Sequence, residues 1–247
     1  MRRKIFSFIV LISVFFSFAL VKDGLCYRIP PEDDDMGYLY VFGEDGKSSY
    51  GAKKEPQVIF LRVPKTYNED IEVSIYDPDV GEFLDEKSGK WNTKTRFSIF
   101  GGEGAYSSIA GLNEEDITDF GEGILLDVKD FGMDKKYDRK FYHFPPIGAS
   151  EGEDIGGFRY FKIVIEGLSG DDNNMFSLMI SPDIVETFSY VLSLRLPERR
   201  GAKIDLYPEI PKDAASIIEY NYDLDSTGGT IEIVTTSRAY DIEGSET

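Results

Sequence analysis

The sequence has very few of the residues on which exported and catalytic proteins often depend. Its one cysteine in 247 residues, Cys26, excludes an internal disulfide and a CxxC metal site. Its one histidine, His143, leaves little room for histidine-based chemistry. Basic residues are also scarce, with 27 Lys and Arg against 45 Asp and Glu and a formal net charge of −18. Because a phosphate backbone would repel this acidic surface, we expect no nucleic acid partner.

The chain contains a single long apolar run, and it lies at the N-terminus. A basic start at residues 2–4 precedes 17 uncharged residues, 5–21, and small residues Gly24 and Cys26 stand at positions −3 and −1 of a cut before residue 27. This arrangement predicts a secretory signal peptide over residues 1–26. Two alternatives stay open, an uncleaved N-terminal anchor and a lipoprotein cut before the cysteine. The residue before that cysteine, a leucine, is large for a lipoprotein.

No second apolar run of about 18 residues follows, so we expect no integral membrane span after signal cleavage. The prediction is an exported protein of the periplasm, the outer-membrane surface or the extracellular space. Once cleaved after Cys26, the chain would have no cysteine and would depend on its core or on bound ions for stability.

The rest of the chain is predicted to form short β-strands. Hydrophobic residues make up 41% and aromatic residues 14%, enough for a packed core. Ile71, Val73 and Ile75 alternate with polar residues, and alternation of this kind is typical of antiparallel sheets with one packed face. We predict an all-β, antiparallel β-sandwich of about twelve strands. The predicted strands are residues 38–42, 57–63, 71–76, 95–100, 124–128, 140–144, 158–166, 176–180, 187–196, 203–207, 217–222 and 230–236.

Turn-rich segments suggest how these strands are organised. Residues 27–37 are predicted to be a flexible acidic lead. Prolines and glycines between Pro145 and Gly157 mark the clearest internal boundary, so we expect two packed sandwich halves, 38–150 and 151–247, with one large sandwich as the alternative. Residues 167–174, rich in Gly, Asp and Asn, are expected to join two strands as a hairpin.

Acidic residues gather in the loops between predicted strands, which raises the question of calcium. Ca²⁺ takes several oxygen ligands from short flexible loops. The clearest pattern places Asp223, Asp225 and Thr227 at alternate positions before Gly228, but threonine is a weak ligand and Val234 stands where a calcium loop has its last glutamate. Two other acidic loops complete the set of candidate Ca²⁺ ligands, which is Asp77, Asp79, Asp171, Asp172, Asp223, Asp225 and Thr227. The alternative is that these residues only cap turns.

Signals for catalysis are weak. His143 lies in an aromatic run, which is typical of a packed or edge position. A carboxylate pair would suit a glycosidase, but 45 acidic residues always supply some pair. The only tryptophan, Trp91, stands before a predicted strand and is a candidate for stacking on a sugar or anchoring a partner.

Several motifs resemble the exported β-rich N-terminal region of bacterial envelope proteins that often carry an outer-membrane-protein-A-like C-terminal domain. They are YLYVFG at 38–43, PQV at 56–58, YDPDVG at 76–81, NTKTRFS at 92–98, GGEGAYS at 101–107, EGLSGDDNN at 166–174 and YNYDLD at 220–225. In such proteins that C-terminal domain binds peptidoglycan. The present chain reaches Thr247 without such a domain, so we do not expect peptidoglycan binding from the resemblance.

Together these features predict an exported, non-catalytic β-sandwich that serves as a binding or structural module of the cell envelope, stabilised by calcium if the acidic loops bind it. Its expected partner is an envelope protein or glycan. The alternative is a hydrolase that acts on envelope polysaccharide or peptide through a carboxylate pair.

Overall fold

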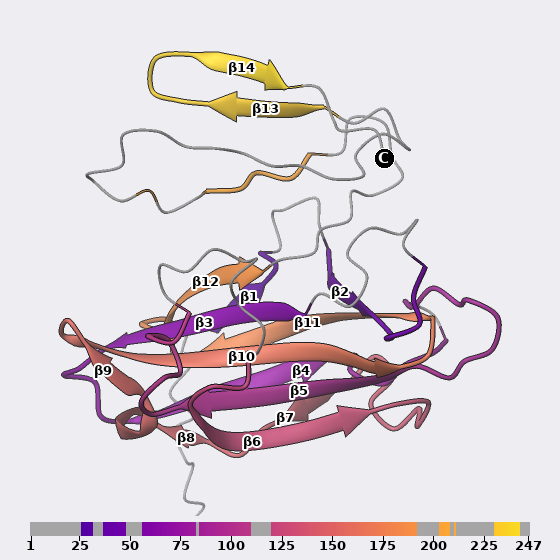
Figure 1. Cartoon of the computed structure of the whole chain (residues 1–247). Coiled ribbons are helices and arrows are strands. Elements are labelled where there is room, and N and C mark those ends of the chain that lie inside the picture. Colours follow the sequence, from indigo (N-terminus) through magenta and orange to yellow (C-terminus); the bar gives the residue numbers. More distant parts are fainter. Residues whose placement is uncertain are drawn as a thin grey trace, which may run out of the picture.

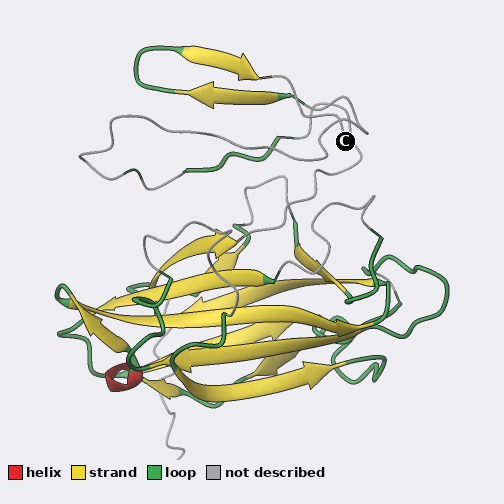
Figure 2. Ribbon diagram, in the orientation of Figure 1, coloured by secondary structure: helices red, strands yellow, loops and turns green. Residues whose placement is uncertain are grey.

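The computed structural model describes residues 26–31, 37–47, 56–82, 84–109, 120–191, 203–207, 210 and 230–242. Within these residues the chain is built from antiparallel strands, which confirms the predicted all-β sandwich class (Figure 2). Helical structure in the described residues is one short 3-10 turn, Ala149–Glu151, and none of it is long and apolar enough to cross a membrane.

Two six-stranded sheets form the body of the molecule (Figure 1). In the first sheet β11 pairs with β1, β2 and β4, and β4 also pairs with β7 and β8. The strands of this sheet are β1 (Tyr27–Ile29), β2 (Leu39–Phe42), β4 (Asp70–Tyr76), β7 (Phe141–His143), β8 (Ile147–Gly148) and β11 (Asn173–Ser181).

The second sheet has the order β12-β3-β10-β5-β6, with β9 paired to β10. Its strands are β3 (Gln57–Pro64), β5 (Lys94–Gly101), β6 (Ile124–Phe131), β9 (Glu153–Ile155), β10 (Phe158–Ser169) and β12 (Glu186–Val191). A separate two-stranded sheet consists of β13 (Ile231–Val234) and β14 (Ala239–Ile242).

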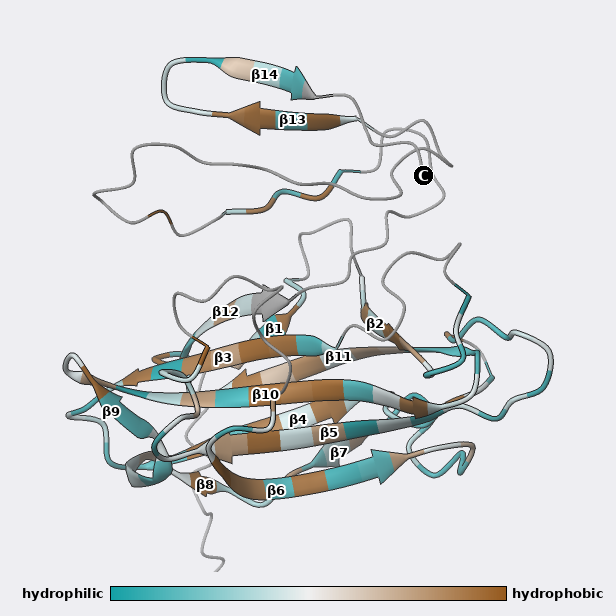
Figure 3. Cartoon of the chain, viewed as in Figure 1, coloured by the Kyte–Doolittle hydropathy of each residue, from teal (hydrophilic) through white to brown (hydrophobic). Residues whose placement is uncertain are grey.

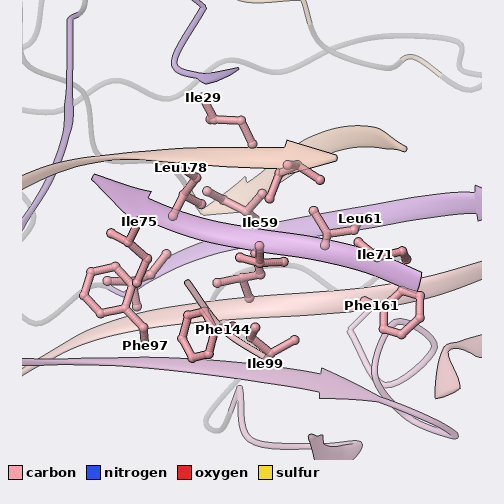
Figure 4. Packing of buried hydrophobic residues seen from close by; sticks show 14 of the residues in the cluster. Ile29, Ile59, Leu61, Ile71, Ile75, Phe97, Ile99, Phe144, Phe161 and Leu178 are labelled. Atoms are coloured by element: carbon pink, nitrogen blue, oxygen red, sulfur yellow. The ribbon is translucent and has the colours of Figure 1, made fainter. Parts of the chain in front are cut away.

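The core lies between the two large sheets, where alternate side chains of their strands meet (Figure 4). Phe97 on β5 and Phe176 on β11 join the sheets through an edge-to-face contact with ring centroids 4.9 Å apart. Burying a side chain of this size contributes about 1.5–3 kcal/mol. The core strands supply mainly Ile59, Leu61, Val63, Ile71, Val73, Ile75, Phe97, Ile99, Phe161, Ile163, Ile165, Phe176, Leu178 and Ile180.

The outer face of the second sheet is also covered in part. Val58 and Phe60 on β3 pack against Ile109 and Tyr106, which belong to the glycine-rich segment after β5. The buried carboxylate of Glu153 holds this segment, because it accepts hydrogen bonds from the backbone N–H groups of residues 104, 106 and 107 at 3.1, 2.7 and 2.9 Å. The glycine-rich segment is therefore a fixed cover of this face of the sheet.

The predicted division into two halves at residue 150 needs correction. β10 and β11 follow that boundary, yet β10 pairs with β3 and β5, and β11 pairs with β2 and β4, which precede it. Each large sheet therefore takes strands from both sides, and a single sandwich replaces the two halves. Residues 167–174 do not form a hairpin either, because β10 and β11 belong to different sheets and this segment crosses between them.

Two further predictions of local structure are wrong in part. The start of the supposed flexible lead is strand β1, which pairs with Leu178–Ile180 and buries Ile29 in the core. The predicted strand at Lys203–Tyr207 is irregular, because it has no partner strand among the described residues and Tyr207 is 89% exposed. The signal peptide and the predicted strand at 217–222 lie outside the described part, apart from Cys26.

Candidate functional site

Three connections that cross between the sheets meet at one end of the sandwich. They join β4 to β5, β6 to β7 and β10 to β11, and we call their described residues, 77–82, 84–93, 132–140 and 170–172, the loop end. Backbone hydrogen bonds link the first two connections, from Val80 N to Gly132 O at 2.9 Å and from Asp77 N to Lys140 O at 3.0 Å. The loop end contains all of the candidate site residues that the structure describes: Asp77, Asp79, Asp171, Asp172 and Trp91.

Asp172 is the central residue of the connection between β10 and β11. Its side chain is fully buried, and its carboxylate accepts hydrogen bonds from the backbone N–H groups of Ser88 (2.8 Å), Asn92 (2.9 Å) and Thr93 (3.3 Å). Its own backbone N–H donates to the hydroxyl of Thr93 at 2.8 Å. Asp172 therefore fastens the loop before β5 to the start of β11. Its neighbour Asp171 is only partly buried.

The two asparagines that follow continue this fastening. Asn173 Oδ1 accepts a hydrogen bond from Glu86 N at 2.6 Å. Asn174 Nδ2 donates to Pro78 O and to Thr95 Oγ1, both at 2.8 Å. Both side chains are fully buried, so the sequence DDNN acts as a structural connector. Asn173 Nδ2 and Asn174 Oδ1 have no hydrogen-bond partner among the described residues.

Asp77 and Asp79 fasten the loop after β4 to the connection between β6 and β7. Asp77 Oδ1 accepts a hydrogen bond from Arg139 N at 2.7 Å, and Asp79 Oδ2 accepts one from Tyr137 N at 2.6 Å. Both residues are buried. Asp77 adopts φ = 59°, a left-handed conformation that Asp tolerates better than most residues. An aspartate therefore suits the position directly after β4.

Asp85 plays the same role and was not among the predicted candidates. Its Oδ2 accepts from Gly81 N and its Oδ1 accepts from Met175 N, both at 2.6 Å. It therefore closes its own loop and attaches that loop to β11. No specific signal in the sequence points to it, since Asp85 stands among other acidic residues without a motif.

These carboxylates lie close enough together to change each other's protonation. Burial raises the pKa of Asp85 to about 7, and repulsion from Asp77 and Asp138 adds to this effect. Burial likewise raises the pKa of Asp77 to about 6, with repulsion from Asp138 and Asp79. The pKa of Asp79 and that of Asp138 are also raised, mainly by burial. The backbone hydrogen bonds to Asp77, Asp79 and Asp85 oppose this shift, so these interactions favour the ionised form while burial disfavours it.

A metal-binding role finds no support in the geometry of the described residues. Within them, no group of three or more His, Cys, Asp or Glu side chains is arranged to hold a metal ion. The oxygens of Asp172 already face backbone N–H groups, which makes that carboxylate an acceptor within the fold. Asp223, Asp225 and Thr227, the most calcium-like of the predicted ligands, lie outside the described residues.

Trp91 lies half-buried beside the turn that contains Asp77, Asp79 and Gly81, which we call the acidic turn. A side chain added at Gly81 would meet Trp91 Cδ2 at 3.9 Å and Met133 Cγ at 4.0 Å, so these two side chains flank the backbone of Gly81. Met133 is 56% exposed, and the ammonium of Lys87 lies 5.8 Å from the Trp91 ring centroid. The structure thus brings the predicted binding residue and the predicted acidic turn, which the sequence treated as separate, to one surface.

His143 and Ser74 are neighbours on the outer face of the first sheet. They are paired across β7 and β4, and Ser74 Oγ lies 2.7 Å from His143 Nδ1. His143 is exposed on β7, an edge strand, and its ring stacks near Phe141 with centroids 6.0 Å apart. The described residues place no carboxylate in hydrogen-bond contact with this histidine, so the pair lacks the third member of a catalytic triad.

A shallow, open hollow of about 580 Å³ lies on the outer face of the second sheet. Its lining is mixed, with an ion pair between Arg96 and Asp130 at 2.7 Å on one side. The hollow is lined by Arg96, Ser98, Phe100, Leu125, Val128, Lys129, Asp130 and Glu166. This surface does not present a pair of carboxylates that face a deep cleft, which a hydrolase would require.

Comparison with known proteins assigns no relationship: no protein-family model matches the chain, and the curated proteins contain no significant match to its sequence.

Proposed function

We propose that the chain is an exported β-sandwich protein of the bacterial cell envelope and that it acts as a non-catalytic binding or structural module. Export rests on the basic start and the single apolar run of residues 5–21. The resemblance to the β-rich region of envelope proteins points in the same direction. An envelope protein or glycan is the proposed partner.

The observation that carries the binding role is the construction of the loop end. Loops on a rigid sandwich are the usual place for binding residues, because the scaffold fixes their positions. Here Asp77, Asp79, Asp85 and Asp172 tie three inter-sheet connections together through backbone hydrogen bonds. Trp91 then lies on a fixed support, and an aromatic side chain held in this way loses little entropy when it contacts a partner.

The experiment measures sedimentation of the purified protein with isolated bacterial envelopes and with the polysaccharide fraction prepared from them. We expect wild-type protein to sediment with one of these, and Trp91→Ala to weaken binding by about tenfold or more, as for a central interface residue. Ile184→Ala is the matched control, because Ile184 is a 43% exposed apolar residue in the turn between β11 and β12. Equal binding of both variants would contradict the proposal that the loop end is the binding surface.

Asp223, Asp225 and Thr227 are the proposed calcium ligands. The carboxylates of Asp77 and Asp172 already accept backbone hydrogen bonds, which favours a role in the fold for them. Calcium stabilisation of the chain would therefore come from the Asp223–Thr227 segment.

A hydrolase acting on envelope polysaccharide or peptide is the second candidate, favoured by one observation. The pKa of Asp85 is raised to about 7 and that of Asp77 to about 6, mainly by burial, and catalytic acids often have raised pKa values. Against it, both oxygens of Asp85 accept backbone N–H groups. Release of reducing ends or free amines from envelope fractions, lost in Asp85→Asn and Asp77→Asn, would favour the hydrolase over the binding module.

A further inference from the structure

The edge strand β6 carries an unusual combination of exposed apolar and oppositely charged side chains. Among the described residues β6 pairs with β5 alone, so its other edge is open there, at the lower rim of the body in Figure 1. Three apolar residues of this strand are exposed: Ile124 (60%), Leu125 (51%) and Val128 (40%). Apolar and polar bands follow one another along β6 in Figure 3. An open strand edge is a template for another strand, and the regular stretch of β6 is residues 127–131, which follow a β-bulge.

The charges on β6 restrict which strand could pair there. Asp127 and Lys129 are opposite Ile99 and Phe97 in the register with β5, so both point toward the inner side of the sandwich at its rim. The Lys129 ammonium lies 5.9 Å from the ring centroid of Tyr142 on the facing sheet. A strand that carried no matching charges would cover Asp127 and Lys129 without pairing them, which is unfavourable.

β6 itself has the matching pattern. In an antiparallel pair of two β6 strands centred on Val128, Asp127 of each copy is opposite Lys129 of the other. A register centred on Asp127 or on Lys129 would instead place like charges opposite each other, which is destabilising. Only the Val128 register gives two ion pairs, and it also brings the two exposed Val128 side chains together.

The backbone of β6 is suited to such an exchange. The Val128 N–H donates to the carboxylate of its neighbour Asp127 at 2.7 Å, so in the single copy this group is satisfied by a side chain rather than by a strand. In the pair, the Val128 N–H would donate to the Val128 carbonyl of the second copy, and the released Asp127 carboxylate would face Lys129 of that copy.

We propose that β6 is a self-association surface, through which two copies of this chain pair antiparallel about Val128 and join their second sheets into one continuous sheet. The inference does not depend on the proposed binding role of the loop end. The hollows beside Val128 in the two copies would then lie next to each other across the two-fold axis.

The test uses charge variants of the protein expressed as the full 247-residue chain, with mass measured by sedimentation equilibrium. Wild-type protein should form a dimer, and Asp127→Lys and Lys129→Asp should each raise the dimer dissociation constant about tenfold or more, because each places like charges opposite each other. A mixture of the two variants should form a heterodimer, since the first variant then has a lysine at both positions and the second an aspartate at both, so that every facing pair has opposite charges.

Glu69→Lys is the control for Asp127→Lys, because it makes the same change of charge in the exposed turn between β3 and β4. It should dimerise as wild type does. Thermal unfolding of each variant alone establishes that it is folded. A monomeric wild-type protein, dimers that persist in both single variants, or a mixture that stays monomeric would each overturn the proposal.

Discussion

Replacing Asp172 by alanine removes a carboxylate that holds three backbone amides of another loop. The side chain is fully buried, and two of its three hydrogen bonds, from Ser88 N and Asn92 N, are 2.8 and 2.9 Å long. Hydrogen bonds to a charged group contribute about 1.5–3 kcal/mol each, and a buried N–H without an acceptor costs about 1–3 kcal/mol. Since the third bond, from Thr93 N, is longer at 3.3 Å, we expect a loss of about 3–5 kcal/mol in the free energy of unfolding.

Urea unfolding followed by far-UV circular dichroism measures this loss. Asp171→Ala is the matched control, because Asp171 is an adjacent aspartate that is only partly buried, and its substitution should change the free energy of unfolding by about 0.5 kcal/mol or less. Trp91 adjoins the anchored Asn92, so its fluorescence reports separately on this loop. An equal loss in the two variants would refute the conclusion that Asp172 fastens the loops.

Three further predictions concern the other carboxylates. The folded-state pKa values of Asp77 (about 6) and Asp85 (about 7) lie above the ordinary 3.8, so the folded protein binds these two protons more tightly than the unfolded chain does. The protonated carboxyl groups therefore contribute stability below about pH 4, and this contribution is lost as the pH rises to about 7. Asp85→Asn should therefore reduce the change of the thermal midpoint with pH between about pH 4 and 7. An unchanged slope would contradict the raised pKa of Asp85. Burial would raise the pKa of Glu153, but the hydrogen bonds to its carboxylate outweigh burial and lower the pKa. The contribution of Glu153 to folding stability is therefore present above the ordinary pKa of 4.5 and is lost as the pH falls through the lower folded value. Glu153→Gln should cost about 1–3 kcal/mol and speed proteolysis within residues 102–109, and wild-type cleavage rates would argue against a fixed cover. Millimolar Ca²⁺ should raise the thermal midpoint of wild type relative to a chelator, but not that of the double variant Asp223→Asn/Asp225→Asn, while a shift that Mg²⁺ reproduces equally would count against a calcium site.

The class of fold could be predicted because alternation in the strands is a local signal. β4 illustrates this, since Ile71, Val73 and Ile75 all face the core as their spacing requires. Strand partners could not be predicted in the same way, because pairing depends on contacts that are distant in the sequence. The segment at 167–174 looks like a hairpin turn, yet its strands lie in different sheets. Short strands such as β1, β8 and β9 carry too few residues for a pattern to appear.

The candidate site was predicted only in its residue types. The aspartates at 77, 79 and 172 stood out as acidic turn residues, but their burial and their backbone partners depend on loops that are 58 to 84 residues away. The alternation also predicted that one face of the strands is exposed to solvent. Val58 and Phe60 on β3 are instead covered on the outer side by the segment that contains Ile109. Such cover by a later loop leaves no periodic signal in the strand itself.

Buried carboxylates fasten the three inter-sheet connections into one rigid end. Amide hydrogen exchange, measured residue by residue by NMR, tests this most directly. The backbone amides of Ser88, Asn92, Tyr137, Arg139 and Met175 donate to the carboxylates of Asp172, Asp79, Asp77 and Asp85. We predict that these amides exchange as slowly as those of the core strands, although all but Met175 lie in loops. Exchange at the rate of an exposed loop would contradict the claim.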